Sequence, residues 1–496
     1  MISLGDFVFL GVYLSVLVGL SAFGLHRLHM AFTYLRFRHA GAREPSPPED
    51  WPQVTVQLPL YNERYVAERL IRATAALDWP RDRLHLQVLD DSTDDTVTLV
   101  AAVVEQLRAE GHDIVHLRRS ERHGFKAGAL SHGLERAKGE LVAVFDADFV
   151  PAQDFLKRTV PHFADPGVGM VQARWGHINR EFSWLTRAQS VLLDGHFLIE
   201  HTARNRSGRF FNFNGTAGVW RRAAIDEAGG WQHDTLTEDL DLSYRAQLKG
   251  WRFVFLPEVV APAEVPVDMN AFKAQQHRWA KGSIQVARKL LPRILRSSQP
   301  LKVKLEALVH LTGNLGYPLL VTLALMAPFA LHRRAELGLH QTLVIDLPFF
   351  LGATLSVSVF YLLSQRELGR SALERWATLP VVLAVGIALA VNNSRATVEA
   401  LLGQVSPFVR TPKLGVVGRA SRLNGVAYQA RRNAFALVEL ALAAVYLLTI
   451  IQAARAGLWV TVPFLALFLA GFLLAGLGSL MPPRAVTPSP LPEAAP

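Results

Sequence analysis

Residues 141–149 read Leu-Val-Ala-Val-Phe-Asp-Ala-Asp-Phe, and this stretch decides the fold of the middle of the chain. Its first five residues are apolar and rich in valine, which is typical of a buried β-strand. Side chains at i and i+2 of an extended segment point the same way, so Asp146 and Asp148 can both face one bound cation. An Asp-x-Asp pair alone is weak evidence, because turns and helix caps use the same residues. Its position directly after a strand favours a binding site.

Short strands and helices alternate on both sides of this stretch. Strands are predicted at residues 54–58, 84–89, 114–117, 141–145 and 168–172, and helices at residues 63–77, 95–110, 126–137 and 152–163. Alternation of this kind predicts an α/β domain with a mostly parallel sheet and right-handed crossovers. Ligands of such sheets bind beyond the carboxyl ends of the strands, so the residues that follow each strand are the candidate site.

Polar side chains follow two more of the predicted strands. Tyr61 and Glu63 come after the first strand, and Asp90 and Asp91 come after the second. The two aspartates could instead cap the next helix, but Ser92 and two further aspartates are equally placed to do so. Asp90 and Asp91 are then free to bind a base or a ribose. Three polar clusters at three strand ends are more than a structural scaffold needs.

The chemistry of these clusters suits a diphosphate and a divalent cation. Two carboxylates and the oxygens of a diphosphate form a usual site for Mg²⁺ or Mn²⁺. The cation offsets the charge that builds up on a departing nucleoside diphosphate. Lys126 opens a predicted helix after a glycine, and an ammonium at a helix N-terminus suits a diphosphate. A solvated lysine is the equally weighted alternative.

A second acidic motif lies further along the chain. Residues 237–241 read Thr-Glu-Asp-Leu-Asp and precede a predicted helix. Glu238 or Asp239 could act as a general base that accepts the proton of an attacking sugar hydroxyl. The alternative is a capping box with Thr237 as the N-cap, and capping and catalysis are compatible.

The stretch Gln-Gln-His-Arg-Trp occupies residues 275–279. Gln275 and Gln276 offer amide donors, and Arg278 offers a guanidinium for phosphate. Trp279 offers a broad aromatic surface for a sugar ring. Taken separately, these residues would fit an interfacial amphipathic helix.

The rest of the chain is markedly apolar. Half of the 496 residues are hydrophobic and 19% are charged, with a formal net charge of +10. Apolar residues are concentrated in runs at 7–25, 315–331, 343–363, 379–391, 435–453 and 459–480. Arg and Lys stand beside these runs, which favours a membrane surface and not nucleic acid as the partner. The absence of Cys excludes disulfides, thiolate metal sites and thiol catalysis.

The charges around the apolar runs predict the topology. Basic residues from Arg27 to Arg38 follow the first run, which places the next segment in the cytosol and disfavours a signal peptide. Residues 392–433 hold seven basic side chains, and run 379–391 is short for a span, which takes about 20 residues. That run is therefore interpreted as an interfacial or re-entrant helix, giving five spans and a cytosolic C-terminus. The arginine pair at 333–334 argues against this topology.

The predicted organisation of the chain has seven parts. Residues 283–310 are expected to form amphipathic helices in the headgroup plane, because apolar residues recur at helical spacing between Arg and Lys. A solvated basic helix is the alternative there. The remaining parts are an N-terminal transmembrane helix at 1–30, a catalytic domain at 50–282, transmembrane helices at 311–363 and 434–481, the re-entrant helix and a loop at 377–433, and a disordered tail at 482–496.

The motifs together resemble family 2 glycosyltransferases of the cellulose synthase superfamily, and in particular the cellulose synthase-like glucomannan (β-mannan) synthases and their bacterial relatives. The resemblance rests on Asp-Asp-Ser at 90–92, Asp-Ala-Asp at 146–148, Thr-Glu-Asp at 237–239 and Gln-Gln-His-Arg-Trp at 275–279, followed by membrane helices. Matching stretches also occur at 57–63, 87–93, 125–130, 171–175, 213–220 and 227–231. The likeness is strong over residues 50–285, and it implies a Rossmann-like glycosyltransferase A fold.

The resemblance also implies roles for the candidate residues. Asp91 would bind the nucleotide base, Asp148 would bind Mg²⁺ or Mn²⁺, and Asp239 would be the general base beside Glu238. The diphosphate and the acceptor end would be held by Gln275, Arg278 and Trp279. The further substrate-binding candidates are Tyr61, Glu63, Lys126, Gln276 and Asp146, the last also a candidate metal ligand.

A loop near the C-terminal spans is similar to the gating loop of cellulose synthases. The candidate gating residues are Phe408, Thr411 and Lys413. Arg410 stands where a valine is usual in the family, which weakens the expectation of a gating role.

The sequence therefore predicts an inverting, integral membrane hexosyltransferase with a cytosolic catalytic domain, in a bacterial-type inner or plasma membrane. The expected donor is UDP-glucose or GDP-mannose, and the expected product is a β-glycan that the protein translocates. The alternative enzyme is a non-processive glycolipid synthase that glucosylates diacylglycerol or a similar lipid. A transporter or receptor is disfavoured, because the spans carry few ionisable residues.

Overall fold

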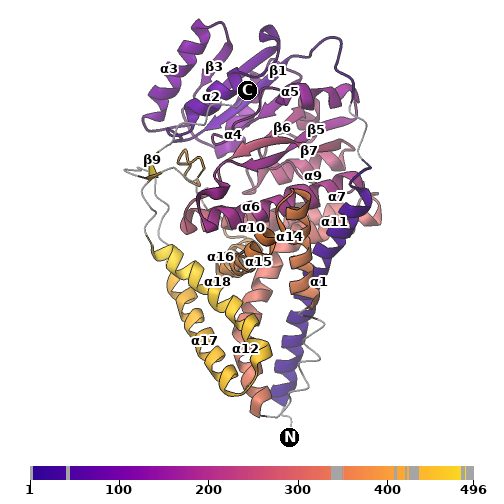
Figure 1. Cartoon of the computed structure of the whole chain (residues 1–496). Coiled ribbons are helices and arrows are strands. Elements are labelled where there is room, and N and C mark those ends of the chain that lie inside the picture. Colours follow the sequence, from indigo (N-terminus) through magenta and orange to yellow (C-terminus); the bar gives the residue numbers. More distant parts are fainter. Residues whose placement is uncertain are drawn as a thin grey trace.

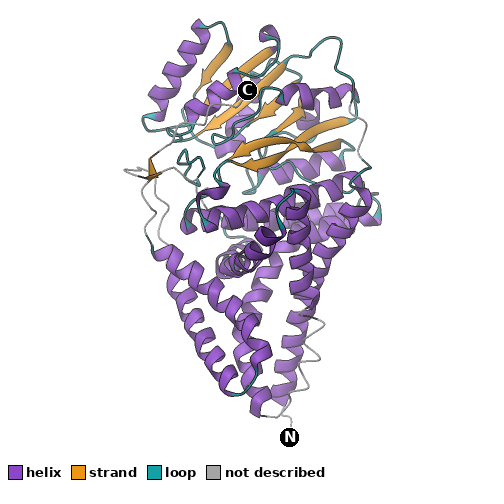
Figure 2. Ribbon diagram, viewed as in Figure 1, coloured by secondary structure: helices purple, strands orange, loops and turns teal. Residues whose placement is uncertain are grey.

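The structure is a computed structural model that describes residues 4–40, 45–336, 349, 351–406, 410–418, 422–423, 435–481 and 486–487. A layered domain of strands and helices sits on a tapering bundle of long helices (Figure 1). All strands lie in the upper part, where a two-stranded pair of β8 (Arg422–Leu423) and β9 (Val486–Thr487) stands beside the main sheet (Figure 2). The two parts correspond to the α/β region and the apolar runs of the sequence.

The upper domain is built on a seven-stranded sheet with the strand order β3-β2-β1-β4-β6-β5-β7. Strands β1 to β4 that pair with one another are parallel, as are β5 and β7, whereas β6 is antiparallel to both of its neighbours. The predicted α/β class and mostly parallel sheet are thus confirmed. The strands are β1 (Val54–Leu60), β2 (Leu84–Asp90), β3 (Asp113–Leu117), β4 (Leu141–Val144), β5 (Val168–His177), β6 (Gly218–Arg221) and β7 (Arg252–Ala263).

The alternation of side chains along β4 divides the core of this domain into two. Leu141 and Ala143 face one hydrophobic cluster, which also contains Val100 of α3 (Thr96–Ala109). Val142 and Val144 face the other cluster, together with Leu242. Because both faces of the strand are buried, the apolar run lacks the alternation of a half-exposed strand. Burial of each leucine or valine side chain contributes about 1.5–3 kcal/mol.

The sequence pattern predicts β1 to β5 but misses β6 and β7. Strand β6 has only four residues and opens with Gly218, which gives little pattern to detect. Strand β7 contains Pro257 and Pro262, and proline usually argues against a strand. Its place at the edge of the sheet explains the tolerance, because one side of an edge strand has no partner to bond.

The helices fall into two groups. Those packed around the sheet are α2 (Ala67–Ala75), α3, α4 (Phe125–Glu135), α5 (Phe155–Thr159), α8 (Arg222–Glu227) and α9 (Glu238–Leu248). Helices α6 (Trp184–Asp194) and α7 (Thr202–Arg206) are joined by a π-helical segment at Gly195–His201. The helices below are α1 (Leu4–Phe37), α10 (Met269–Arg296), α11 (Leu301–Thr312), α12 (Gly316–Glu336), α14 (Ser356–Glu367), α15 (Ala372–Ala388), α16 (Ala390–Leu401), α17 (Ala436–Arg455) and α18 (Val462–Leu480).

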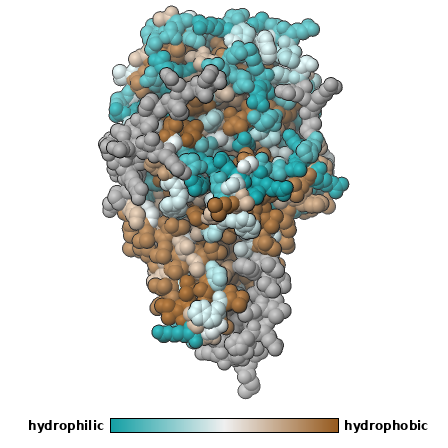
Figure 3. All heavy atoms as spheres, in the orientation of Figure 1, coloured by the Kyte–Doolittle hydropathy of each residue, from teal (hydrophilic) through white to brown (hydrophobic). Residues whose placement is uncertain are grey.

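Among the described residues, four helices are long and apolar enough to cross a membrane. They are Leu4–Phe37, Leu301–His332, Ala436–Arg455 and Trp459–Leu480, and they contain four of the five predicted spans. Helices α15 and α16 would be a fifth if the bent pair is one span, and the bend between them is 41°. The lower part of the surface is accordingly hydrophobic, while the upper domain is mostly hydrophilic (Figure 3).

Three predictions of the sequence fall wholly or partly outside the described residues. The predicted span 343–363 is described mainly from residue 351 onward, where its end forms part of α14. Phe408 of the gating-like loop and most of the tail at 482–496 also lie outside them. The predicted re-entrant run 379–391 contains the end of α15 and the bend before α16.

Candidate functional site

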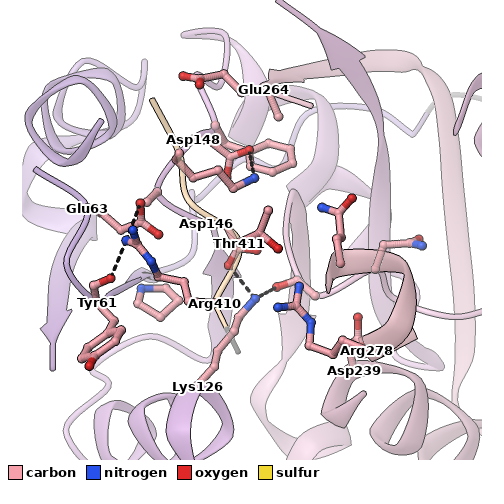
Figure 4. Close-up of a pocket in the computed structure, with 18 of the residues that line it drawn as sticks. Tyr61, Glu63, Lys126, Asp146, Asp148, Asp239, Glu264, Arg278, Arg410 and Thr411 are labelled. Carbon is pink, nitrogen blue, oxygen red and sulfur yellow. Dashed lines mark hydrogen bonds and ion pairs between the residues drawn. The ribbon is translucent and has the colours of Figure 1, made fainter. Parts of the chain in front are cut away.

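A pocket opens beyond the carboxyl ends of β1, β2 and β4, where the sequence predicts the site. Residues from α9, α10 and the segment 410–418 complete its walls (Figure 4). Its charged and aromatic lining residues are Tyr61, Glu63, Asp91, Arg122, Lys126, Asp146, Asp148, Phe149, Trp175, His177, Glu238, Asp239, Glu264, Arg278, Trp279, Arg410 and Lys413.

Asp146 and Lys126 form the ion pair at the centre of this pocket. Lys126 Nζ donates to Asp146 Oδ1 at 2.5 Å and to the carbonyl of Gly215 at 2.9 Å. The Asp146 backbone N–H donates to Thr216 Oγ1 at 2.8 Å, which fixes the turn that follows β4. Burial lowers the pKa of Lys126, but Asp146 and Glu238 outweigh it, so the pKa is raised and the ammonium keeps its charge.

Asp239 lies on the opposite side of the same lysine, at the start of α9. Burial and the neighbouring Glu238 raise its pKa to about 7, against the opposing effect of Lys126. Its Oδ1 accepts from the Leu240 N–H at 2.8 Å. Gly215 makes the close approach possible: it has a φ of +81°, and a Cβ there would lie 3.0 Å from Asp239 Oδ2. A carboxyl group with a pKa near 7 is suited to general base catalysis.

The predicted capping role of Thr237 is wrong. Thr237 is the N-cap residue of α9, but its side chain makes no capping hydrogen bond. Its Oγ1 is buried with no hydrogen-bond partner among the described residues. The hydroxyl lies against Gly282 of α10, so the side-chain bond that a capping box requires is not made.

Asp148 is buried deeper and is paired with the segment that follows α16. Lys413 Nζ lies 2.6 Å from Asp148 Oδ2, and the Asp148 side chain is only 3% exposed. Arg69 donates to the Asp148 carbonyl at 3.2 Å and to Glu264 at 2.6 Å. Burial raises the pKa of Glu264, with a further contribution from Asp148. Asp146 and Asp148 therefore each form an ion pair with a lysine.

Arg410 occupies the entrance near the end of β1. Its guanidinium lies 3.1 Å from Glu63 Oε2 and donates to the carbonyls of Tyr61, at 2.8 Å, and Asn62. Burial raises the pKa of Glu63 to about 8, while Arg410 and Lys413 oppose the shift. Buried Thr411, between the two cations, has no hydrogen-bond partner for its Oγ1 among the described residues. The described part of the gating-like segment thus contributes Arg410, Thr411 and Lys413 to the pocket lining.

Asp91 and Asp90, adjacent in sequence, have different surroundings. Asp91 lines the pocket and is held by Arg119, whose Nε lies 3.0 Å from Oδ1. Asp90 is turned away: it faces His116 Nε2 at 2.9 Å and accepts from the Ser92 N–H, so its predicted freedom to bind a base is wrong. Asp94, and not Ser92, accepts from the first turn of α3, through the Thr96 N–H.

Helix α10 divides the Gln-Gln-His-Arg-Trp stretch between two faces. Gln275, Arg278 and Trp279 line the pocket. Gln276 does not line it, and His277 faces Glu399 of α16 at 3.2 Å. Burial lowers the pKa of Arg278 despite the nearby Glu238.

Several pocket residues are missed by the sequence reasoning. Trp175 and Asn214 lie in stretches that match the family, 171–175 and 213–220, so a signal was present. Arg122, whose guanidinium lies 3.4 Å from the Tyr61 ring centroid, carries no such signal, and neither does Glu264.

The donor set suits a hard divalent cation with an incomplete protein shell. Among the described residues, no three His, Asp or Glu side chains converge to hold a metal ion. Mg²⁺ and Mn²⁺ are commonly bound by one or two carboxylates, with water and phosphate oxygens completing the shell. Asp146 and Asp148 supply such a pair, next to a lysine that suits a diphosphate.

The comparisons with known proteins agree with this site. Residues 52–282 match the model described as glycosyltransferase like family 2. Glucomannan 4-beta-mannosyltransferase 2 of Arabidopsis thaliana is 45% identical over 255 residues, which are 50% of this chain and 48% of the relative. Glucomannan 4-beta-mannosyltransferase 1 of Oryza sativa subsp. japonica is 42% identical over 283 residues, 55% of this chain and 54% of the relative. The chain thus spans about half the length of these relatives.

A solved structure supports the fold. A mannosyltransferase from Pyrobaculum calidifontis, in complex with GDP-Man and Mn2+, has a TM-score of 0.51 and 24% sequence identity, covering 71% of this chain and 97% of that chain. At this identity the likeness shows a shared fold. The sequence match and the shared fold agree with the resemblance read from the motifs: residues 52–282 of this chain are similar to the family 2 glycosyltransferases.

Proposed function

We propose that this protein transfers a hexose, with inversion, from a nucleoside diphosphate sugar to a hydroxyl group of a glycan. The observation that carries the proposal is the convergence of Lys126, Asp146 and Asp239 at one point of the pocket. Such a site holds a diphosphate, its cation and a general base within reach of one another. GDP-mannose is the favoured donor, because the named relatives are mannosyltransferases and the solved structure contains GDP-Man.

The donor is bound along the carboxyl ends of the strands. Asp91 accepts from the base, and Lys126 and Arg278 contact the diphosphate. A Mg²⁺ or Mn²⁺ ion held by Asp146 and Asp148 would supply further positive charge for the departing diphosphate. Trp279 presents its ring to the acceptor sugar.

The chain's own residues account for the proton transfer. Asp239 accepts the proton of the acceptor hydroxyl as that oxygen bonds to the anomeric carbon, and Glu238 keeps the carboxylate basic. The bond from the anomeric carbon to the diphosphate breaks, and its electron pair stays on the phosphate oxygen. Arg278 stabilises that charge. One displacement of this kind inverts the configuration at the anomeric carbon.

The apolar helices place this chemistry at a membrane. Basic residues between Arg27 and Arg38, at the end of α1 next to the sheet domain, support a cytosolic catalytic domain, as in a protein of a bacterial inner membrane. A product made at this surface would be a glycan that the chain also moves across the bilayer.

The proposal is tested with the full-length protein in liposomes, incubated with Mn²⁺ and either labelled GDP-mannose or labelled UDP-glucose. We expect label from GDP-mannose in a polymer that a β-mannanase digests. Label in a lipid carrying a single sugar would replace the polymer proposal with the glycolipid synthase. No transfer from any nucleotide sugar would contradict both.

A further inference from the structure

Helix α10 carries two polar faces with different neighbours. Gln275, Arg278 and Trp279 point to the pocket. Lys273 and Lys281, two turns apart, lie with His277 on another face. This second face is not used by the proposed reaction, although its lysines are among the most buried charged groups of the described chain.

Two glutamates from the lower helical part neutralise this second face. Lys273 Nζ donates to both carboxylate oxygens of Glu439 on α17, at 2.7 and 2.6 Å. Lys281 Nζ lies 2.9 Å from Glu399 Oε2 at the end of α16. The side chains of Lys273 and Lys281 are 2% and 0% exposed, so neither can turn to water if its partner is lost.

Glu399 also connects α10 to the segment that enters the pocket. Its Oε2 lies 3.5 Å from Ser406 Oγ, and Ser406 also bonds to Lys281. Ser406 precedes Arg410 and Lys413, the cations that reach Glu63 and Asp148. One carboxylate therefore contacts helix α10 and also Ser406, which precedes the 410–418 segment in the chain.

Removal of this carboxylate would leave Lys281 buried without a counter-ion. Loss of one partner of a buried pair is strongly unfavourable, because the remaining charge is not compensated. The helix can relieve this by shifting towards water. A small shift would move Arg278 and Trp279, which lie less than one turn before Lys281, relative to the sheet.

We propose that Glu399 is a positioning residue: through Lys281 and Ser406 it sets the place of Arg278 and Trp279 and of the 410–418 segment. The expected effect on kcat rests on the proposed function, whereas the positioning of these residues by Glu399 does not. Glu399 does not line the pocket, and besides Lys281 and Ser406 it contacts His277 and Arg395. Glu439 anchors the start of the same helix through Lys273.

The test compares Glu399→Gln with Glu399→Asp and with a matched control. Glu374→Gln serves as the control, because Glu374 of α15 also reaches from the lower part to a cation of the upper domain, Arg180, at 2.9 Å, without touching α10. The full-length variants are measured for melting temperature, for Mn²⁺-dependent GDP affinity and for transfer from GDP-mannose.

We expect Glu399→Gln to lower kcat on the order of 100-fold, as small displacements of catalytic groups do, and to lower GDP affinity much less. Its melting temperature should also fall, because Lys281 loses its counter-ion. Glu399→Asp keeps the charge and should recover part of kcat, and the control should match the wild type. A wild-type kcat in Glu399→Gln overturns the proposal. The proposal is also overturned if Glu374→Gln loses as much kcat as Glu399→Gln and if the loss follows melting temperature. The contacts of Glu399 would then be purely structural.

Hydrogen exchange separates this inference from the proposed function. In Glu399→Gln, amides of residues 275–281 and 410–418 should exchange faster than in the wild type and the control. Unchanged exchange there overturns the inference even if the wild type is an active transferase. Faster exchange supports the placement even if no sugar is transferred. If Glu399→Gln does not fold, Glu399→Asp decides: raised exchange at both segments supports the proposal, and wild-type exchange overturns it.

Discussion

At the scale of single residues, Asp239 is distinguished from the other pocket carboxylates by its partners. Asp146 and Asp148 each form an ion pair with a lysine at 2.6 Å or less. Asp239 instead has a second carboxyl group, that of Glu238, beside it. Burial and Glu238 raise the pKa of Asp239 to about 7. The three carboxylates are thus suited to different tasks.

The pKa of Asp239 predicts a pH dependence. A general base works in its deprotonated form, so kcat/KM should fall about tenfold for each pH unit below about 7. The measurement is kcat/KM for transfer between pH 5 and 9 with the donor and Mn²⁺ fixed. A plateau that extends down to pH 5 would be incompatible with Asp239 as the base.

Replacement of Asp239 tests the same role from another side. Asp239→Asn keeps the shape of the side chain but removes the basic oxygen, so kcat should fall by about 10²- to 10⁴-fold. GDP binding with Mn²⁺, measured by calorimetry, should persist because Asp91, Lys126 and Asp148 are intact. Retained turnover in Asp239→Asn would remove it from the mechanism.

At the scale of elements, the sequence predicts those parts of the site that sit at strand ends. Asp91, Asp146 and Asp148 follow buried strands with clear apolar patterns, so their convergence could be predicted. Glu264 follows β7, and this strand is hard to predict from the sequence because it contains two prolines. Local pattern also says nothing about which neighbour a side chain meets across the fold. Asp90 is an example, because its side chain contacts His116 on β3.

The segment 410–418 gives a prediction about cation binding. Lys413 pairs with Asp148 at 2.6 Å, so its ammonium competes with a divalent cation for that carboxylate. Lys413→Met should strengthen Mn²⁺ binding in the absence of nucleotide by at least about tenfold, since a nearby unit charge is worth several kcal/mol at a partly buried site. Titration of free Mn²⁺ by electron paramagnetic resonance measures this. Equal or weaker Mn²⁺ binding in Lys413→Met would show that the pair does not compete.

At the scale of the whole molecule, the sheet domain and the apolar helices are held together by ion pairs as well as by apolar packing. Arg27 of α1 lies 2.5 Å from Glu200, and Glu306 of α11 accepts from Arg204 at 2.8 Å. Such pairs fix the sheet domain on the helices instead of leaving it on a flexible tether. The arrangement explains how a pocket can be built from both parts.

This architecture predicts that the protein cannot be stripped from a membrane. The four apolar helices should keep it in the pellet after sodium carbonate extraction at high pH, because they bury apolar surface in lipid. Detergent should release it, with the nucleotide-binding pocket intact. Release by carbonate alone would contradict the assignment of the apolar helices as spans.

The central claim, that the pocket transfers a sugar from a nucleoside diphosphate donor, is tested most directly by product formation in liposomes with purified full-length protein. With Mn²⁺ and labelled GDP-mannose, the account predicts a β-linked glycan from the wild type and none from Asp239→Asn. Folded, nucleotide-binding protein that transfers sugar from neither GDP-mannose nor UDP-glucose would contradict it.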